Sequence, residues 1–460
     1  MLLHDNQLKI FKHKARFKII RAGRRSGKST LCIEIMLLKA VSKKDQQIFY
    51  VSPNQKQSRS IVWEVAKSRL KGQGKINESR MEIELPTKDG GVSRIFIAGF
   101  ETRESFRGLK ADLIVFDETD SMPDFFIGWQ EIFRPALTDT AGKAIFIGTP
   151  KKENPNLRRL EKIAQEDDDY TAFHFKTEDN PYIPVEEIAK AEKELDYDTY
   201  KQEFLAEYLD TAGALFNYDA LIDVFSNTVT KQDSKYLIVD IAGDGSDKTI
   251  FSFWEGLEEY RREVFERMDT EGVVNKIREY ASQDQIPFSQ IAVDAIGIGE
   301  GVASSSMLDG IKGYKSSYQA IKTDINIVHL PNVGYTKGIP LSSDYKNLRS
   351  QCVFILADLV NNHKIASKVD GQFKEYTIEE LSNYQDVSQG DGKRMATMSE
   401  DVKAIIGRSP DHASTWIMRM YFEIMGKMLP SQSADTALIH SKQQEQFRMN
   451  QNNQIVNSNK

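Results

Sequence analysis

The stretch FKIIRAGRRSGKSTLCIEIMLL, residues 17–38, decides the fold of the first half of this chain. Its apolar start predicts a buried β-strand over residues 17–20, a loop that contains glycine over 21–29, and an amphipathic helix over 30–38. A loop of this kind turns consecutive backbone N–H groups toward one point, and the helix adds its positive N-terminal end. Because phosphate oxygens bind at such points, the stretch predicts a phosphate-binding loop between a strand and a helix.

Gly27, Lys28 and Ser29 complete the Walker A pattern, in which the lysine reaches the β- and γ-phosphates of a nucleotide and the hydroxyl holds Mg²⁺. Ala22 stands where the first glycine of the pattern is usual, and Gly23 lies one residue later. The alternative is a basic loop that binds no nucleotide. We expect the phosphate cradle to consist of Ala22, Gly23, Arg25, Ser26, Gly27, Lys28, Ser29 and Thr30.

The length and composition of the chain limit the classes of protein to which it can belong. A chain of 460 residues with 40% hydrophobic and 28% charged residues is typical of a soluble protein with two or three domains. No apolar run approaches the roughly 18–20 residues that cross a bilayer, so we expect a cytoplasmic protein without membrane contact. Cys32 and Cys352 are the only cysteines, which excludes a disulfide framework and a cysteine-based zinc site.

The net charge of −6 is unevenly distributed. Residues 1–60 contain fourteen Lys or Arg and three Asp or Glu, a balance of +11, which leaves −17 for the other 400 residues. This asymmetry favours the binding of a polyanion near one end of the chain, although a solvated basic face is an equal alternative.

The run DLIVFDE, residues 112–118, predicts a buried parallel strand that delivers Asp117 and Glu118 to the carboxyl edge of a sheet. This is a Walker B element: Asp117 would hold Mg²⁺ through water, and Glu118 would orient or deprotonate the water that attacks the γ-phosphate. The alternative is an acid pair that caps the next helix. The strand at 144–147 ends before Thr149, whose hydroxyl can contact the γ-phosphate or its water.

Other elements of the first half follow from simple patterns. Residues 47–52 predict a second strand, residues 60–70 a helix, and residues 81–85 with 93–98 a hairpin. Alternating strands and helices predict an α/β domain with a doubly wound parallel sheet.

Four polar side chains are further candidates for this site. Gln7 can present one donor and one acceptor to the edge of adenine, although a surface glutamine is at least as common. Arg107, Arg24 and Arg25 are candidates for placing positive charge on the transition state. The sequence does not choose among the three arginines.

The second half contains strands that end in acids. Residues 236–240 predict a strand ending at Asp240, residues 249–254 a second strand, and residues 290–294 a later strand ending at Asp294. Asp411 begins a helix that we expect to run to about residue 425. This is the element order of a ribonuclease H-like domain, in which the first and fourth strands are neighbours. We therefore expect Asp240 and Asp294 to face each other, with Asp411 above them.

Three clustered carboxylates repel one another unless divalent cations lie between them. Two such ions can activate water and stabilise the leaving oxygen of a phosphodiester, and oxygen ligands favour Mg²⁺ or Mn²⁺. Asp244 and Asp247 are possible auxiliary ligands, although acids that form turns are commoner. Taken singly, an acid at a strand end means little, and Asp411 alone is most often a helix N-cap.

These patterns divide the chain into four parts. We expect a P-loop ATPase domain of the RecA/ASCE type over residues 1–176, a helical linker or lid subdomain over 177–231, and a ribonuclease H-like nuclease domain over 232–428. Residues 429–460 predict a disordered tail, because 11 of the last 30 residues are Gln or Asn and few are large and apolar.

Over most of residues 1–425 the sequence resembles the large terminase subunit of tailed bacteriophages. The resemblance lies in AGRRSGKS at 22–29, FDE at 116–118, GTP at 148–150, DNP at 179–181 and RSPD at 408–411. Members of this family often lack the first Walker A glycine. This chain departs from the family in HisAlaSer after Asp411, where a further acid is common, and in having no obvious lysine shortly before that motif.

The resemblance implies an ATPase that uses ATP and Mg²⁺ to translocate double-stranded DNA, and a nuclease with two Mg²⁺ or Mn²⁺ that cuts concatemeric DNA. It implies a homo-oligomeric ring on the portal protein of a procapsid, with a small terminase subunit as partner. The protein would act in the cytoplasm of the infected bacterial host, transiently at the portal, and would be absent from the mature virion.

Three other classes of protein compete with this interpretation. An ATP-dependent DNA helicase or nuclease of repair or recombination would need a second RecA-like lobe, whereas the chain after residue 231 has acid-tipped strands in ribonuclease H order. A recombinase or transposase-type nuclease would not need the two Walker elements. A DNA-binding scaffold without activity would gain nothing from Lys28, Glu118 or three converging carboxylates.

Overall fold

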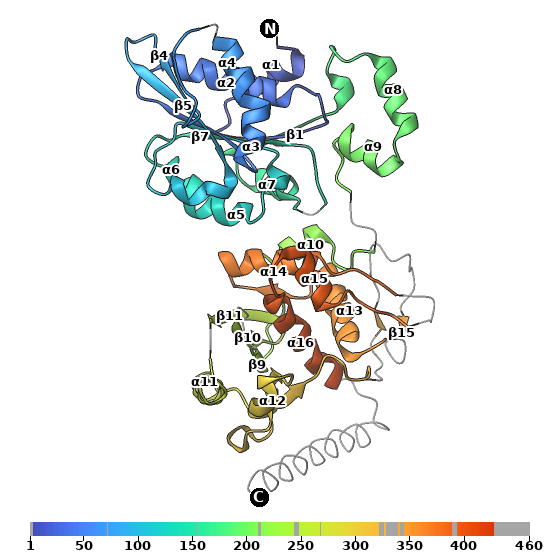
Figure 1. The fold of residues 1–460 in the computed structure, drawn as a ribbon. Helices are drawn as coiled ribbons and strands as arrows, with labels where there is room; N and C mark the ends of the chain where they lie inside the picture. The colour runs from blue at the N-terminus through green and yellow to red at the C-terminus, as the bar shows by residue number, and fades with distance from the viewer. Residues whose placement is uncertain are drawn as a thin grey trace, which may run out of the picture. The chain divides into compact units, whose positions relative to one another are not determined.

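The computed structural model describes residues 3–426 except 71, 153, 210–212, 243–247, 267, 322–325, 328–338, 341–344 and 389–392. The predicted tail and the candidates Asp244 and Asp247 lie outside the described residues. The chain divides into two compact units, Met1–Thr211 and Ala212–Lys460 (Figure 1). Among the described residues, no helix is long and apolar enough to span a membrane.

The first unit is built on an eight-stranded sheet with the order β3-β4-β5-β2-β6-β7-β1-β8. Six neighbouring strands are parallel: β5 Val92–Gly99, β2 Gln47–Ser52, β6 Leu113–Asp117, β7 Lys143–Gly148, β1 Phe17–Ala22 and β8 Tyr170–Phe175. The strands β3 Lys75–Asn77 and β4 Glu82–Pro86 extend the sheet in antiparallel fashion, so the predicted hairpin is confirmed.

Alternating side chains of this sheet enter two separate apolar cores. Ile20 and Tyr50 pack with Leu31 and other residues of helix α2 on one face, whereas Ile19 and Phe116 pack with aromatic residues on the other. Both faces are covered, which explains why these strands read as nearly continuous apolar runs. The predicted doubly wound parallel sheet is confirmed.

The helices of the first unit begin with α1 Asp5–Lys12 and α2 Lys28–Ser42, which starts directly after the phosphate loop. The predicted helix over 60–70 is a π-helical turn, Arg59–Trp63, between α3 Gln55–Ser58 and α4 Glu64–Leu70. The remaining helices are α5 Phe125–Gly128, α6 Arg134–Ala136, α7 Asn156–Glu166, α8 Val185–Glu194 and α9 Tyr197–Glu203.

The second unit contains a six-stranded sheet with the order β13-β12-β9-β10-β11-β16. The strands β9 Lys235–Asp240, β10 Thr249–Glu255 and β11 Glu258–Phe265 are antiparallel to one another. The strand β12 Ile291–Asp294 lies parallel beside β9, and β13 Lys312–Tyr314 parallel beside β12. The sheet ends at β16 Ala366–Ser367, and β14 Asn326–Ile327 with β15 Ile339–Pro340 forms a separate pair. The first and fourth strands are neighbours, which confirms the predicted ribonuclease H-like order.

Helices cover both faces of this sheet. Helices α13 Leu348–Asn361 and α16 Asp411–Met425 share a core with Ile238 and Trp254, and α11 Thr270–Gln283 packs with Val239 and Phe251 on the other face. The predicted extent of the helix that begins at Asp411 is therefore correct. The other helices are α10 Tyr218–Asp223, α12 Ile298–Ala303, α14 Gln372–Ser382 and α15 Ser399–Ile406.

The structure divides the predicted helical subdomain, residues 177–231, between the two units. Helices α8 and α9 belong to the first unit, whereas α10 belongs to the second. The segment around α10 packs into the core of the second unit through Leu215, Phe216, Ala220, Leu221 and Val224. The division between the units thus lies at residues 211 and 212 and not after residue 231.

Candidate functional site

The phosphate loop connects β1 to α2 and has two residues in left-handed conformations, Arg25 with φ 58° and Gly27 with φ 88°. Helix α2 begins at Lys28, so its free N–H groups face the loop. Ser26 is fully buried, and its hydroxyl oxygen has no hydrogen-bond partner within the described part of the chain. A buried, unsatisfied hydroxyl in a loop of this shape fits a phosphate ligand.

The side chains of Lys28, Thr149 and Glu118 meet beside this loop. The Nζ atom of Lys28 donates to Oγ1 of Thr149 at 3.1 Å and lies 3.9 Å from Oε1 of Glu118. The Thr149 hydroxyl also contacts the carbonyl oxygen of Ala22 at 3.2 Å. These three predicted residues converge because β7 lies between β1 and β6 in the sheet.

Asp117 is buried, and its Oδ2 atom accepts hydrogen bonds from the hydroxyls of Ser29, at 3.4 Å, and Tyr50. Burial, together with the charge of neighbouring Glu118, raises the pKa of Asp117 to about 6. A serine hydroxyl and a carboxylate in contact are oxygen ligands of the kind that Mg²⁺ prefers.

Tyr50 was absent from the sequence-based candidates. It lies on β2, where it is the register partner of Val115 on β6, two residues before Asp117. The local sequence of β2 does not predict the contact of Tyr50 with Asp117, because that contact depends on the pairing of β2 with β6, which are distant in the chain.

Glu118 has a left-handed backbone with φ 54°, and its N–H donates to Oδ1 of Asp117 at 3.0 Å. Such a conformation costs a non-glycine residue roughly 1–2 kcal/mol. The turn that follows keeps it in place, since Asp120 accepts N–H groups of Lys151 and Leu157 at 3.0 and 2.7 Å.

Gln7 contacts the phosphate loop directly. Its Nε2 donates to the carbonyl oxygen of Gly27 at 3.0 Å, and its Oε1 accepts the N–H of His4 at 3.1 Å. The side chain is buried, and both ends of its amide are bonded within the protein. In this arrangement Gln7 supports the loop, and its reading of adenine would require both hydrogen bonds to break.

The candidate arginines differ in their surroundings. Arg24 is paired with Glu203 of α9, and Arg107 is exposed and paired with Glu104 at 2.6 Å and Glu131 at 3.2 Å. Arg25 is also exposed. The structure holds the guanidinium groups of Arg24 and Arg107 on carboxylates and does not single out one of the three for catalysis.

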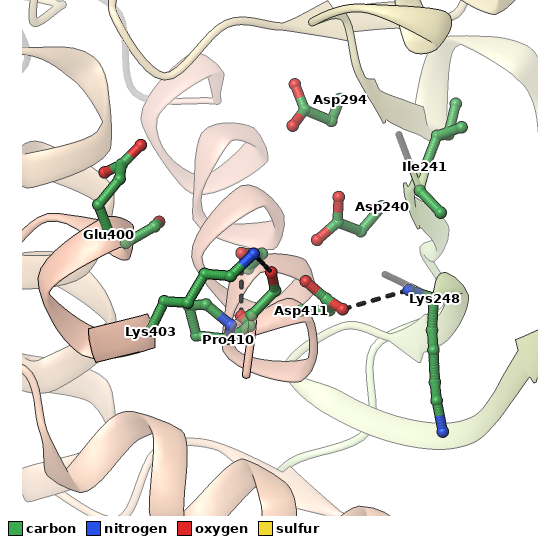
Figure 2. A pocket seen from close by; sticks show the side chains of 12 residues that line it. Asp240, Ile241, Lys248, Asp294, Glu400, Lys403, Pro410 and Asp411 are labelled. Atoms are coloured by element: carbon green, nitrogen blue, oxygen red, sulfur yellow. Dashed lines mark hydrogen bonds between the residues drawn. The ribbon is translucent and has the colours of Figure 1, made fainter. Parts of the chain in front are cut away.

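A second candidate site lies in the second unit. Asp240 at the end of β9, Asp294 at the end of β12 and Asp411 at the start of α16 line one pocket of about 300 Å³ (Figure 2). The structure therefore brings together the three acids as the order of elements predicted.

The burial of Asp294 fits a cation ligand. Its Oδ1 atom is buried without a hydrogen-bond partner among the described residues, and burial raises the pKa of its carboxyl group to about 6. Oδ2 of Asp411 accepts the backbone N–H of Lys248 at 3.4 Å. No group of three or more His, Cys, Asp or Glu side chains within the described ranges is already placed to hold one ion.

Two lysines also line this pocket, Lys248 and Lys403. Lys403 belongs to α15 and donates to the Ser409 hydroxyl at 2.8 Å, close to Asp411 in the view of Figure 2. Sequence reasoning found no obvious lysine before this motif. The short turn between α15 and α16 brings Lys403 back to the pocket, and its place eight residues before Asp411 could have indicated it.

Residues 19–222 match the model of the family described as terminase large subunit, T4likevirus-type, N-terminal. The large subunit of the terminase of Escherichia phage T5 is 26% identical over 214 residues, which are 45% of this chain and 47% of that protein. The chain thus matches about half the length of this curated relative.

Three solved structures are similar to this chain at low identity. The large terminase of a thermophilic bacteriophage covers 89% of this chain and 98% of its own, with 15% identity and a TM-score of 0.42. The ATPase domain of the Thermus phage P74-26 large terminase covers 45% of this chain and 94% of its own, with 20% identity and a TM-score of 0.40. The nuclease domain of the large terminase subunit of bacterial virus Sf6, solved with manganese, covers 45% of this chain and 98% of its own, with 17% identity and a TM-score of 0.37.

Because these TM-scores are below 0.5, the similarity to terminases rests on the sequence match of residues 19–222. Over residues 19–222 the chain is similar to terminase large subunits in their N-terminal part.

Proposed function

We propose that this chain is a viral DNA-packaging motor subunit that hydrolyses ATP to move double-stranded DNA into a procapsid and cleaves concatemeric DNA. The observation that carries the proposal is the presence, in one chain, of two chemically different sites. Lys28, Thr149 and Glu118 meet at a phosphate loop in the first unit, and three aspartates line one pocket in the second.

In the first unit the chain's own residues bind and orient the nucleotide. Lys28 binds the β- and γ-phosphates, and Glu118, already near Lys28, orients the attacking water and accepts its proton. Ser29 and Asp117 would hold Mg²⁺, which neutralises charge on the phosphates. Thr149, which accepts a hydrogen bond from Lys28, contacts the γ-phosphate or its water.

In the second unit Asp240, Asp294 and Asp411 would hold two Mg²⁺ or Mn²⁺ ions. Such a pair supplies an activated water and stabilises the leaving oxygen of a phosphodiester. Lys403 at the same pocket attracts the phosphate of the DNA strand, because a lysine ammonium contacts phosphate as a point charge.

The family also supports proposals about partners. We propose that the chain works as a homo-oligomeric ring on the portal protein of the procapsid, with a small terminase subunit as a partner that selects the site on the DNA, and that it acts in the cytoplasm of the infected bacterium. An ATP-dependent DNA helicase is less well supported, because three central strands of the second sheet as described, β9, β10 and β11, are antiparallel, whereas the sheet of a RecA-like lobe is parallel.

The test is a paired mutant assay on purified protein. Lys28→Ala or Glu118→Ala is expected to reduce ATP hydrolysis by at least about 100-fold, because each removes a group that acts on the reacting phosphate. These variants should still nick plasmid DNA in the presence of Mn²⁺. Asp240→Ala or Asp294→Ala should abolish nicking and leave ATP hydrolysis unchanged. If either pair lost both activities while folded, the assignment of one activity to each site would be wrong.

A further inference from the structure

Helix α16, which carries Asp411 at its first position, begins without a cap of its own. Its N-cap residue is Pro410, whose side chain can accept no hydrogen bond. The first N–H groups of a helix need partners from elsewhere when they are buried. The direction of the Asp411 carboxylate therefore depends on what holds this end of the helix.

Glu380 of α14 supplies the missing cap. Its side chain is fully buried, and its Oε2 atom accepts the N–H of Ala413 at 2.6 Å. Its other carboxylate oxygen pairs with Arg408, which lies in the turn before α16. A carboxylate at a helix N-terminus also interacts favourably with the helix dipole.

A second buried contact holds the next residue of the helix. NH1 of Arg262 on β11 lies 2.9 Å from Nδ1 of His412 and donates to Oγ1 of Thr377 at 2.6 Å. Arg262 is fixed in turn by Glu259 through Nε, at 2.8 Å, and NH2, at 2.7 Å, and neither side chain of this pair is exposed. The side chain of His412, which follows Asp411, is thus held in the protein interior by its contact with Arg262.

We propose that Glu380 and Arg262 are positioning residues that fix the start of α16 so that Asp411 can join Asp240 and Asp294 around a divalent cation. The proposal rests on the nuclease function proposed above. It also gives the buried His412 a role, because its side chain is an anchor for Arg262.

The first test compares Glu380→Gln with Glu379→Gln. Both glutamates pair with Arg408, but the N–H of Ala413 is bonded to Glu380. Mn²⁺ binding would be measured by electron paramagnetic resonance on the full chain without DNA or nucleotide, with Asp294→Ala as the baseline for binding elsewhere. Glu380→Gln is expected to weaken Mn²⁺ binding, and to raise the Mn²⁺ concentration for half-maximal plasmid nicking, about tenfold. Glu379→Gln should stay within about twofold of the parent protein.

His412→Leu provides a second, milder variant. It keeps the volume of the side chain and removes the acceptor of Arg262, which retains the carbonyl oxygen of Phe373 and the hydroxyl of Thr377. Mn²⁺ binding should weaken about threefold or more, and His412→Asn, whose amide oxygen can replace Nδ1, should restore most of it. ATP hydrolysis by the first unit should not change in any of these variants.

The experiment distinguishes a failure of the positioning proposal from a failure of the proposed nuclease function. If Glu380→Gln and His412→Leu fold, as judged by their thermal transitions, and bind Mn²⁺ like the parent, the positioning role is wrong. If Glu380→Gln does not fold, His412→Leu alone decides. If the parent protein binds no more Mn²⁺ than Asp294→Ala and does not nick DNA, the proposed nuclease function fails first.

Discussion

At the scale of single residues, the shifted glycine of the phosphate loop has a structural explanation. Ala22, at the usual place of the first glycine, is the last residue of β1 and is buried. Gly23 packs its backbone against a neighbouring segment: a Cβ atom there would lie 2.4 Å from the carbonyl oxygen of Phe204 and 2.5 Å from Oγ1 of Thr177. The glycine is therefore needed for close approach of two backbones.

The close approach of Gly23 to Thr177 and Phe204 predicts a large effect for one substitution in the loop and a small effect for another. Gly23→Ala should push the loop away from Thr177 and Phe204 and lower kcat/KM for ATP at least about tenfold, since misplaced phosphate contacts act directly on the transition state. Ala22→Gly, which restores the usual pattern, should change kcat/KM by less than about threefold and cost about 0.5–1 kcal/mol of stability. Steady-state ATP hydrolysis and urea unfolding measure both. Equal effects of the two substitutions would contradict the close-approach explanation.

At the scale of elements, the order of strands places Thr149 beside the phosphate loop. Because β7 lies between β1 and β6, the end of β7 brings Thr149 between the phosphate loop and the acids of the Walker B strand. In the sequence, Thr149 is 121 residues from Lys28.

Thr149→Val keeps the shape of the side chain and removes the hydroxyl that accepts from Lys28. We expect kcat for ATP hydrolysis to fall about tenfold, as for a hydrogen bond to a charged group, with KM changed less than about threefold. Thr149→Ser, which retains the hydroxyl, should keep most of the activity. A Thr149→Ser variant as impaired as Thr149→Val would show that the methyl group, and not the hydroxyl, is required.

The N-terminal ends of helices α2 and α16 differ in how far local sequence predicts them. Helix α2 begins at Lys28 after a left-handed glycine, which local sequence indicates well. Helix α16 depends on Glu380 from another helix for its cap, which no local pattern indicates.

At the scale of the whole molecule, the boundary between the units decides which fragments fold. Leu215, Phe216, Ala220, Leu221 and Val224 are buried in the core of the second unit. Asn361 bonds the carbonyl oxygen of Leu215 at 2.8 Å and the N–H of Asn217 at 2.7 Å, and the N–H of Ser367 donates to Val224 at 2.9 Å.

A fragment of residues 212–426 should therefore unfold cooperatively, whereas one of residues 232–426 should be less stable by at least about 5 kcal/mol, given about 1.5–3 kcal/mol for each buried apolar side chain. Thermal and urea unfolding of the two fragments would measure this difference. Equal stability would mean that the segment before residue 232 is dispensable for the second unit.

The sequence by itself determined the features that depend on neighbouring residues. The phosphate loop between a strand and a helix, the acid pair at the end of β6, the acid-tipped strands β9 and β12 and the helix from Asp411 all follow from apolar periodicity and the residues at its ends. The order of elements was enough for the ribonuclease H-like sheet, because that topology makes the first and fourth strands neighbours.

Only the tertiary structure decided which candidate side chains are bonded to other protein groups, and which residues outside the motifs contribute to the two sites. Gln7 supports the loop, Arg24 is paired with Glu203, Tyr50 donates to Asp117, Lys403 lines the pocket of the aspartates, and α10 belongs to the second unit. The contacts of Gln7, Arg24 and Tyr50 join residues at least 20 positions apart in the chain. Those of Gln7 and Tyr50 also depend on burial, which excludes water and leaves polar groups to find partners within the protein. Local sequence does not predict the hydrogen-bond partner of a buried polar group, because tertiary packing determines which groups come into contact.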